Sequence, residues 1–453
     1  MGYNGMRGGV AAPKLPAGFQ ARQLAVMLVA AVLRDGRALD DAIVEAYGLA
    51  PFKALEPRDR ALARLIAATV LRRQGQLEAV LSTFLDKPLP EKRGNLTPIL
   101  LTAAAQLLFL DSAPHAVINI AVEQCRHDGG ARRFGSLANA VLRRTSERGR
   151  EIIAAQVDAA RLNIPDWLWK SWASTYGEAV ALQIAAASLV QAPLDISVKS
   201  DATGWGQRMS AVVLPTGTLR MVADGRIEDM PGYQDGGWWV QDAAAALPAK
   251  LLGDVAGKRV ADLCAAPGGK TASLAARGAH VTAVDQSAER LARLTANLDR
   301  LHLTADVIKA DVTSWTPPAL FDAVLLDAPC SATGTIRRHP DILRLKRSTD
   351  ISKIVPLQAQ MLAHAVTLVK IGGMIVFCTC SLEPEEGVNH IAKLLTENPN
   401  LRREPISASE FGGDPAWITD DGDLRTLPFH LQSETVGLSG LDGFYAARLI
   451  RLA

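Results

Sequence analysis

From Lys258 onwards the sequence alternates between short apolar runs and stretches of helical periodicity. The apolar runs span residues 259–263, 280–285, 307–310, 322–327, 374–379 and, near the end of the chain, 444–449. Runs this short and this apolar are typical of parallel strands buried on both faces. Strands that alternate with helices form a doubly wound α/β sheet, which binds ligands outside the carboxyl ends of its strands. We therefore expect functional residues at those ends.

The N-terminal third has a different pattern. Between residues 20 and 148, apolar residues recur at spacings of three and four, which predicts a bundle of six or seven helices. The clearest helices are expected at 97–110, 114–127 and 134–147, and prolines stand near the first two starts, where proline is tolerated. Residues 1–18 are rich in glycine and proline and are predicted to be a disordered tail.

Residues 151–245 are less regular. A helical part at 167–190 precedes short β-like runs at 194–198, 211–214 and 238–241. This pattern indicates a small α+β module that links the two larger parts. The predicted organisation is therefore a tail at 1–18, an all-α domain at 19–150, a linking module at 151–245 and an α/β domain at 246–453.

Charge is distributed unevenly along the chain, although the net charge is only +2. Residues 1–150 hold 21 Lys and Arg against 13 Asp and Glu, and the remainder holds 28 against 34. A basic helical domain is consistent with contact to phosphates. It is equally consistent with a solvated, arginine-rich surface, so charge alone does not decide between the two.

Several classes of protein are disfavoured by the sequence. Five cysteines at irregular spacing form neither a disulfide framework nor a zinc-finger pattern, so no metal site is expected. The apolar run at 24–33 is too short to span a bilayer and predicts a buried helix face. We expect a cytoplasmic protein without a membrane partner, and a monomer.

The first strand of the α/β part runs into the segment DLCAAPGGKT, residues 262–271. Its small residues let the backbone approach a ligand closely, and the helix that follows offers free amides to an anion. The segment is not a phosphate loop, because Leu263 stands where the first glycine is required. Asp285 and Asp311 follow the second and third strands, where a carboxylate can accept hydrogen bonds from ribose or adenine. These features predict an adenosine-containing ligand but do not distinguish NAD from S-adenosylmethionine.

Two cysteine motifs follow the fourth and fifth strands. The fourth ends in Asp327-Ala-Pro-Cys330-Ser, and the fifth ends in Cys378-Thr-Cys380-Ser. Neighbouring parallel strands lie about 4.8 Å apart, so Cys330 and Cys380 can share one cleft with Asp327 beside them. Methylation of carbon 5 of a cytosine needs a nucleophile that adds to carbon 6, a group that protonates or grips the N3/N4 edge, and a means of release. A cysteine thiolate suits the first role, and an acid suits the second. The alternative is that both cysteines are small buried hydrophobes.

At these motifs the chain resembles the NOL1/NOP2/sun family of RNA cytosine-5 methyltransferases, in its bacterial branch that modifies small-subunit ribosomal RNA. The similar segments are residues 262–271, 283–286, 321–342 and 377–387, including PCSATGTIRRHPD at 329–341. Gly387 departs from the family pattern, in which asparagine is expected. The N-terminal domain resembles the NusB RNA-binding fold, most clearly at 114–123 and 139–143.

This resemblance implies a Rossmann-like methyltransferase domain that uses S-adenosylmethionine. It implies that Cys380 is the nucleophile, that Cys330 assists product release and that Asp327 faces both cofactor and base. Spacing alone leaves the nucleophile open, because a Pro-Cys cysteine takes that role in DNA cytosine methyltransferases. The cofactor contacts implied are Cys264, Ala265, Ala266, Pro267, Gly268, Gly269, Lys270, Asp285, Asp311 and Asp327. Arg337, Arg338 and His339 are candidates for holding the RNA backbone.

The function expected is therefore methylation of carbon 5 of a cytosine in RNA, with 16S ribosomal RNA as the expected substrate. A transfer RNA substrate is one alternative. Methylation of an exocyclic nitrogen is disfavoured, because such enzymes carry Asn/Asp-Pro-Pro-Tyr/Phe where this chain has Asp327-Ala-Pro-Cys330. The alternative from another class is a non-catalytic NusB-like RNA-binding factor.

Overall fold

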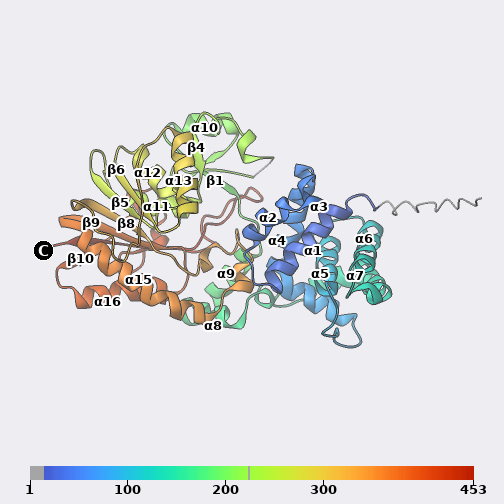
Figure 1. The fold of residues 1–453 in the computed structure, drawn as a ribbon. Coiled ribbons are helices and arrows are strands. Elements are labelled where there is room, and N and C mark those ends of the chain that lie inside the picture. The colour runs from blue at the N-terminus through green and yellow to red at the C-terminus, as the bar shows by residue number, and fades with distance from the viewer. Residues whose placement is uncertain (1–14, 223–224) are drawn as a thin grey trace, which may run out of the picture. The chain divides into compact units, whose positions relative to one another are not determined.

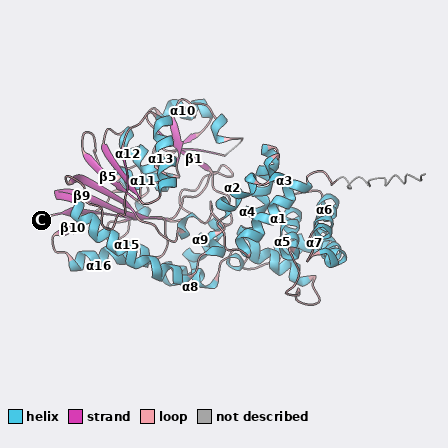
Figure 2. Ribbon diagram, viewed as in Figure 1, coloured by secondary structure: helices cyan, strands magenta, loops and turns pink. Residues whose placement is uncertain are grey.

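The computed structural model describes residues 15–222 and 225–453, and the chain divides into two compact units, Met1–Asn163 and Ile164–Ala453. The first unit is entirely helical in its described part, whereas the second mixes helices with strands (Figures 1 and 2). Of the tail predicted at 1–18, residues 1–14 lie outside the described residues. The predicted boundaries at 150 and 245 stay predictions.

The helical unit is built around one buried helix, α5 (Leu96–Phe109). Nearly every side chain of α5 from Leu96 to Leu108 is buried, because α1, α4, α6 and α7 surround it. The remaining helices are α1 (Phe19–Leu33), α2 (Leu39–Gly48), α3 (Ala50–Lys53), α4 (Pro57–Thr83), α6 (Pro114–His127) and α7 (Gly135–Ala154), with 3₁₀ turns η1 (Arg132–Phe134) and η2 (Arg161–Asn163).

The predictions for this unit are confirmed where they were most specific. The helices expected at 97–110 and 114–127 correspond to α5 and α6 within a residue. The helix expected at 134–147 is α7, which continues to Ala154. The apolar run at 24–33 forms the buried face of α1. No helix of the described residues is long and apolar enough to cross a membrane.

The second unit begins with α8 (Asp166–Tyr176) and α9 (Glu178–Ser188), followed by a small antiparallel sheet of order β2-β3-β1-β4. Its strands are β1 (Leu194–Val198), β2 (Val212–Val213), β3 (Leu219–Met221) and β4 (Trp238–Val240), with α10 (Ala202–Met209), η3 (Ile227–Asp229) and α11 (Ala243–Lys250) between and after them. The helical part at 167–190 and the strands β1, β2 and β4 were predicted. The three-residue strand β3 was not predicted.

The large sheet has the strand order β10-β12-β9-β8-β5-β6-β7, and β11 pairs with β12. Its central strands are parallel, whereas β12 runs antiparallel to β9. The strands are β5 (Arg259–Leu263), β6 (His280–Asp285), β7 (Asp306–Lys309), β8 (Phe321–Asp327), β9 (Val369–Thr379), β10 (Leu401–Arg403), β11 (Leu424–Thr426) and β12 (Phe444–Arg451). All six strands predicted from residue 258 onwards are present, and β10 and β11 were not predicted.

Helices connect the parallel strands and cover the sheet (Figure 2). They are α12 (Gly269–Ala276), α13 (Ala288–Leu301), α14 (Ile342–Leu345), α15 (Ser348–Leu368) and α16 (Val388–Glu397), with 3₁₀ turns η4 (Thr333–Thr335), η5 (Pro384–Glu386), η6 (Ala408–Glu410) and η7 (Pro415–Trp417).

Successive residues of each central strand enter opposite cores, as the two-residue period of a strand requires. Leu325 and Val376 pack on one side with α11, and Val324 and Ile375 pack on the other with α15. Because β5, β6, β8 and β9 are neighbours with a shared direction, the loops that follow them meet at one edge of the sheet.

Candidate active site

The two motif cysteines meet at this edge. Strands β8 and β9 are parallel neighbours in a register that places Asp327 opposite Cys378. The loops that follow carry Cys330 and Cys380 to half-buried positions, where their sulfur atoms are 3.4 Å apart. The structure therefore brings together the two thiols that the sequence placed at neighbouring strand ends.

The surroundings of Cys330 favour its neutral thiol. The contact with Cys380, burial, and the negative charges of Cys380 and Glu386 raise the pKa of Cys330 well above its usual value. Cys378 differs from both, because its side chain is fully buried in the sheet core and its sulfur lies 3.5 Å from Asp327 Oδ1. Burial and the Asp327 carboxylate raise the pKa of Cys378, which is consistent with a packing role.

Asp327, the last residue of β8, is anchored by a lysine of the first turn of α12. Lys270 Nζ, at the start of α12, donates a 2.7 Å hydrogen bond to Asp327 Oδ2. The Lys270 side chain is 9% exposed and that of Asp327 is 31% exposed. Burial lowers the pKa of Lys270, but the adjacent Asp327 carboxylate outweighs this effect and raises it. The lysine thus stays charged and leaves the outer side of the carboxylate open to a ligand.

The loop between β5 and α12 has the tight backbone that the sequence predicts. Cys264 and Gly268 both adopt positive φ angles, 60° and 103°. Beneath the loop, Asp262 Oδ2 accepts a 2.6 Å hydrogen bond from Thr271, and burial raises the pKa of Asp262 to about 7. The loop and its neighbours enclose a small cavity lined by Cys264, Asp285, Gln286, Arg290, Val312, Pro329 and Met361.

The two acidic residues predicted beside this cavity differ in exposure. Asp285 is buried, and its carboxylate accepts hydrogen bonds from the backbone amides of Ala266 and Ser287 at 3.2 and 2.9 Å. Asp311 is exposed, and its hydrogen bonds from the amide and hydroxyl of Thr313 lower its pKa. Only Asp285 lines the cavity, whereas Asp311 stands one residue before the cavity residue Val312.

Arg337 and Arg338, which were predicted to contact RNA, take part in ion pairs within the protein. Arg337 is 3% exposed and binds Asp442 through a 2.8 Å hydrogen bond, and Arg338 binds the same carboxylate at 3.0 Å. Both guanidinium groups also reach Asp242. These cations neutralise buried carboxylates, and their contact with RNA stays a prediction. His339 is exposed, and its RNA contact stays a prediction.

Sequence reasoning missed the residues that connect the two cysteine loops. Ser331 and Ser381, one residue after each cysteine, both donate hydrogen bonds to the buried carboxylate of Glu386. Nothing in the sequence separates Glu386 from the exposed Glu385 beside it. At Gly387, where asparagine was expected, a Cβ atom would lie 3.0 Å from the ring of Tyr445, so the close packing accounts for glycine.

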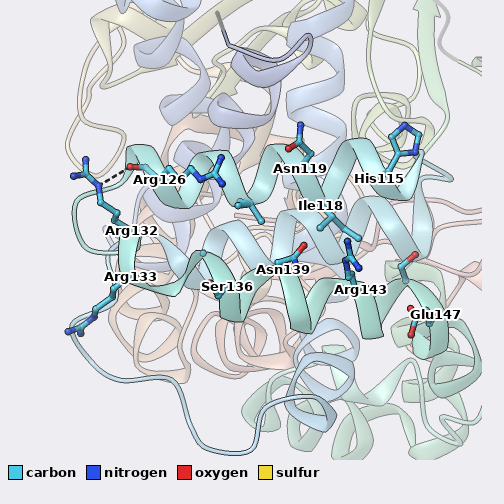
Figure 3. A pocket seen from close by; sticks show the side chains of 13 residues that line it. His115, Ile118, Asn119, Arg126, Arg132, Arg133, Ser136, Asn139, Arg143 and Glu147 are labelled. Atoms are coloured by element: carbon cyan, nitrogen blue, oxygen red, sulfur yellow. Dashed lines mark hydrogen bonds between the residues drawn. The ribbon is translucent and has the colours of Figure 1, made fainter. Parts of the chain in front are cut away.

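The helical unit carries a separate polar groove of about 800 Å³ between α6 and α7 (Figure 3). Four arginines line it, namely Arg126, Arg132, Arg133 and Arg143. His115, Asn119, Ser136 and Asn139 also line it. Arg126 pairs with Glu123. Within the described part of the chain, the structure shows no carboxylate partner for the other three. The groove is therefore mainly cationic, with amide and hydroxyl groups and one carboxylate, that of Glu147, along its length.

Comparison with known proteins identifies both parts of the chain. Residues 249–450 match the family model described as 16S rRNA methyltransferase RsmB/F, and residues 19–147 match the NusB family. The ribosomal RNA small subunit methyltransferase B of Vibrio cholerae is 35% identical over 412 residues, covering 87% of this chain and 90% of that protein. The chain belongs to the ribosomal RNA small subunit methyltransferase B family. It is thus an S-adenosylmethionine-dependent RNA methyltransferase with an N-terminal NusB domain.

Solved structures agree on the fold of this family member. The crystal structure of PH0851 superposes with a TM-score of 0.73 at 21% identity, covering 97% of this chain and 99% of that chain. A methyltransferase homolog protein from Pyrococcus horikoshii gives a TM-score of 0.54 at 25% identity, covering 65% of this chain and 98% of that one.

The residues at the strand ends fit the methyl donor of the family. The cavity joins a buried carboxylate, Asp285, to the apolar surfaces of Val312, Pro329 and Met361. This set combines an acceptor for ribose hydroxyls with a nonpolar bed for an adenine ring.

Proposed function

We propose that this enzyme methylates carbon 5 of a cytosine in small-subunit ribosomal RNA, with Cys380 as covalent nucleophile and Cys330 assisting product release. The observation that carries the proposal is the pair of thiols 3.4 Å apart beside the cofactor cavity. Methylation of a base nitrogen needs no cysteine, whereas methylation of carbon 5 needs one that adds to carbon 6. The relatives' name supports the choice of RNA.

Each side chain has a distinct task in this reaction. The thiolate of Cys380 adds to carbon 6, which makes carbon 5 electron-rich. Asp327 binds the N3/N4 edge of the base, and Lys270 holds that carboxylate in place. S-adenosylmethionine, when bound, supplies the methyl group that carbon 5 acquires. A water molecule then takes the proton from carbon 5, the electron pair of that C–H bond restores the 5,6 double bond, and the bond between carbon 6 and the Cys380 sulfur breaks to regenerate the thiolate. The thiol of Cys330 donates a hydrogen bond to the departing sulfur, which stabilises it as a thiolate.

The same proposal assigns the groove of the NusB domain to the RNA backbone. Arg132, Arg133 and Arg143 supply positive charge, and Asn119 and Asn139 supply hydrogen-bonding groups on the facing helices (Figure 3). Such a surface binds phosphates with little regard to sequence. In this arrangement the NusB domain contributes affinity, and the cleft beside Cys380 selects the base.

The proposal is tested by identifying the product. Purified enzyme is incubated with S-adenosylmethionine and either small-subunit ribosomal RNA or transfer RNA, and the nucleosides are separated by mass spectrometry. We expect 5-methylcytidine from the ribosomal RNA, none from Cys380→Ala, and an unchanged amount from Cys125→Ala, which alters a buried cysteine of the NusB domain. A methylated base nitrogen, or methylation of transfer RNA alone, would contradict the proposal.

A further inference from the structure

A buried carboxylate joins the two cysteine loops. Glu386, in the 3₁₀ turn η5, is 0% exposed. Its Oε1 accepts hydrogen bonds from the backbone amide of Ser331 at 2.8 Å and from Gln358 Nε2 at 3.1 Å. Its Oε2 accepts from the Ser381 hydroxyl at 2.6 Å and from the Ser331 hydroxyl. The two serines therefore tie the residue after each cysteine to one carboxylate.

Further contacts hold the carboxylate itself in place. The Gln358 amide that binds Glu386 also donates to the carbonyl of Pro329 at 2.8 Å, and Gln358 Oε1 lies 2.9 Å from His390 Nε2. Thr379 Oγ1 donates to the backbone carbonyl of Glu386 at 3.1 Å. Strand β9, helix α15 and helix α16 thus all contribute to one hydrogen-bonded network around it.

A carboxylate at this depth is costly unless every lone pair is satisfied, and pairs of apolar residues often stabilise a core better. The four donors on Glu386 meet this requirement without a cation in direct contact. Its position is also specific, because it accepts from both serine hydroxyls, which in addition hydrogen-bond to each other at 3.1 Å. The network is better explained by the geometry of the cysteines than by stability of the fold.

We propose that Glu386 is a positioning residue that holds Cys330 and Cys380 in contact through the serine that follows each cysteine. The inference rests on the proposed cytosine-5 methylation, because the contact matters only if both thiols act on one base. Without the carboxylate, each loop loses this shared anchor, and only direct bonds between the loops, such as that from the Gly334 amide to the Cys380 carbonyl at 2.9 Å, oppose a shift of the sulfur atoms. A displacement of about 1 Å in a reacting group can lower a rate about 100-fold.

The charge of Glu386 also acts on Cys330. Together with Cys380, it raises the pKa of Cys330, and thereby preserves the thiol that hydrogen-bonds to the nucleophile. Other charged groups stand near these loops. Arg425 donates a 2.6 Å hydrogen bond to the carbonyl of Ser381, the buried Glu383 is held by Trp172 and Ser171, and the Lys270–Asp327 pair lies beside Cys378. Removal of the Glu386 charge alone should lower the pKa of Cys330.

The first experiment compares Glu386→Gln with Glu385→Gln in the full-length enzyme. Both variants lose one negative charge, but Glu385 is exposed, whereas Glu386 is buried. We expect Glu386→Gln to lower kcat about 100-fold with unchanged KM for RNA and unchanged calorimetric affinity for S-adenosylmethionine. We expect Glu385→Gln to match the wild-type enzyme. Wild-type kcat in Glu386→Gln, or an equal loss in Glu385→Gln, would overturn the proposal.

The second experiment measures, without RNA, how the charge of Glu386 affects the pKa of Cys330. In a Cys380→Ala background, the pH dependence of Cys330 alkylation by iodoacetamide is followed by peptide mass spectrometry. The midpoint should shift to lower pH when Glu386→Gln is added, and an unshifted midpoint would overturn the electrostatic part. If Glu386→Gln does not fold, Ser381→Ala removes one donor and keeps the charge. Its kcat should fall, and an unchanged kcat would overturn the positioning role.

These outcomes separate the inference from the proposed function. If wild-type enzyme forms 5-methylcytidine through Cys380 and Glu386→Gln is equally active, only the role of Glu386 fails. If wild-type enzyme forms no 5-methylcytidine, the proposed function and the positioning role both fail, whereas a shifted alkylation midpoint would still support the link between Glu386 and Cys330.

Discussion

The sulfur atoms of Cys330 and Cys380 are 3.4 Å apart, although fifty residues separate them in the chain. This contact depends on the parallel pairing of β8 with β9, which starts both loops from the same edge. At this distance both thiols can act in one reaction on one pyrimidine ring. In the proposed mechanism Cys380 adds to carbon 6, and Cys330 hydrogen-bonds to the Cys380 sulfur as it departs. Under the proposed mechanism only one of them forms a bond to RNA, so their roles can be separated by mutation.

Replacement of each cysteine should therefore give a different result. Cys330→Ala should still attack carbon 6 but release product slowly, so a covalent RNA–protein species should accumulate on a denaturing gel while turnover falls. Cys380→Ala should form no such species and no product. Cys125→Ala serves as the control. An adduct that persists in Cys380→Ala and is lost in Cys330→Ala would reverse the two assignments.

Arg337→Ala should affect stability rather than RNA affinity. The change leaves the buried carboxylate of Asp442 without one of its two cations, and loss of one partner of a buried ion pair costs about 3 to 5 kcal/mol. Urea denaturation should show a loss of this order, whereas RNA affinity well below the melting temperature should be unchanged. Arg402→Ala, which breaks an exposed pair with Glu404, should cost less than about 1 kcal/mol. A large loss of RNA affinity in folded Arg337→Ala would support the original prediction.

The groove of the NusB domain should control the salt dependence of RNA binding. A triple change of Arg132, Arg133 and Arg143 to glutamine should reduce the slope of log affinity against log salt by about 2, because each phosphate contact to single-stranded RNA contributes about 0.7. Fluorescence anisotropy over a salt series measures this slope. The matched control changes Lys53, Arg58 and Arg64 on α3 and α4 to glutamine. Equal effects of the two triple variants would show that the groove has no special part in binding.

Asp262 should make the stability of the enzyme depend on pH. Burial raises its folded-state pKa from 3.8 to about 7, so the folded protein binds this proton more tightly than the unfolded chain. The stability that the proton contributes is present at low pH and is lost as the pH rises through about 4 to 7.

Asp262→Asn should remove this dependence and keep the contact with Thr271. Between about pH 5 and about pH 8, the free energy of unfolding of the variant should rise relative to wild type by about 1 to 3 kcal/mol. Urea denaturation at the two pH values gives this difference. A constant difference would mean that Asp262 is ionised over the whole range.

Much of the fold follows from local pattern. Strands β5 and β6 were predicted with their observed bounds, because both are apolar runs bounded by polar or small residues. Strand β12 was predicted as a strand, but its antiparallel place beside β9 was not, since pairing direction depends on the path of the chain between them. Strands β3, β10 and β11, of three residues each, were not predicted.

The site residues also fall into those that the sequence indicated and those that only the tertiary structure revealed. Cys330, Cys380 and Asp327 could be selected from the sequence, because a strand that ends in a chemically reactive residue is a local feature. The ion pairs of Arg337 and the contacts of Glu386 were not foreseen, because the groups that surround a charged side chain come from segments distant in sequence. Arg337 lies beside Asp442, which is distant in sequence, and Glu386 accepts hydrogen bonds from two loops that only the sheet brings together.

The sequence by itself determined the alternation of strands and helices, the cofactor loop and the identity of the two thiols, since these depend on residue type and short-range spacing. The tertiary structure decided which charges are buried, which thiols touch and which carboxylate joins their loops. The physical reason is that burial and hydrogen bonding are set by groups far apart in the chain, and no local pattern records how close they come.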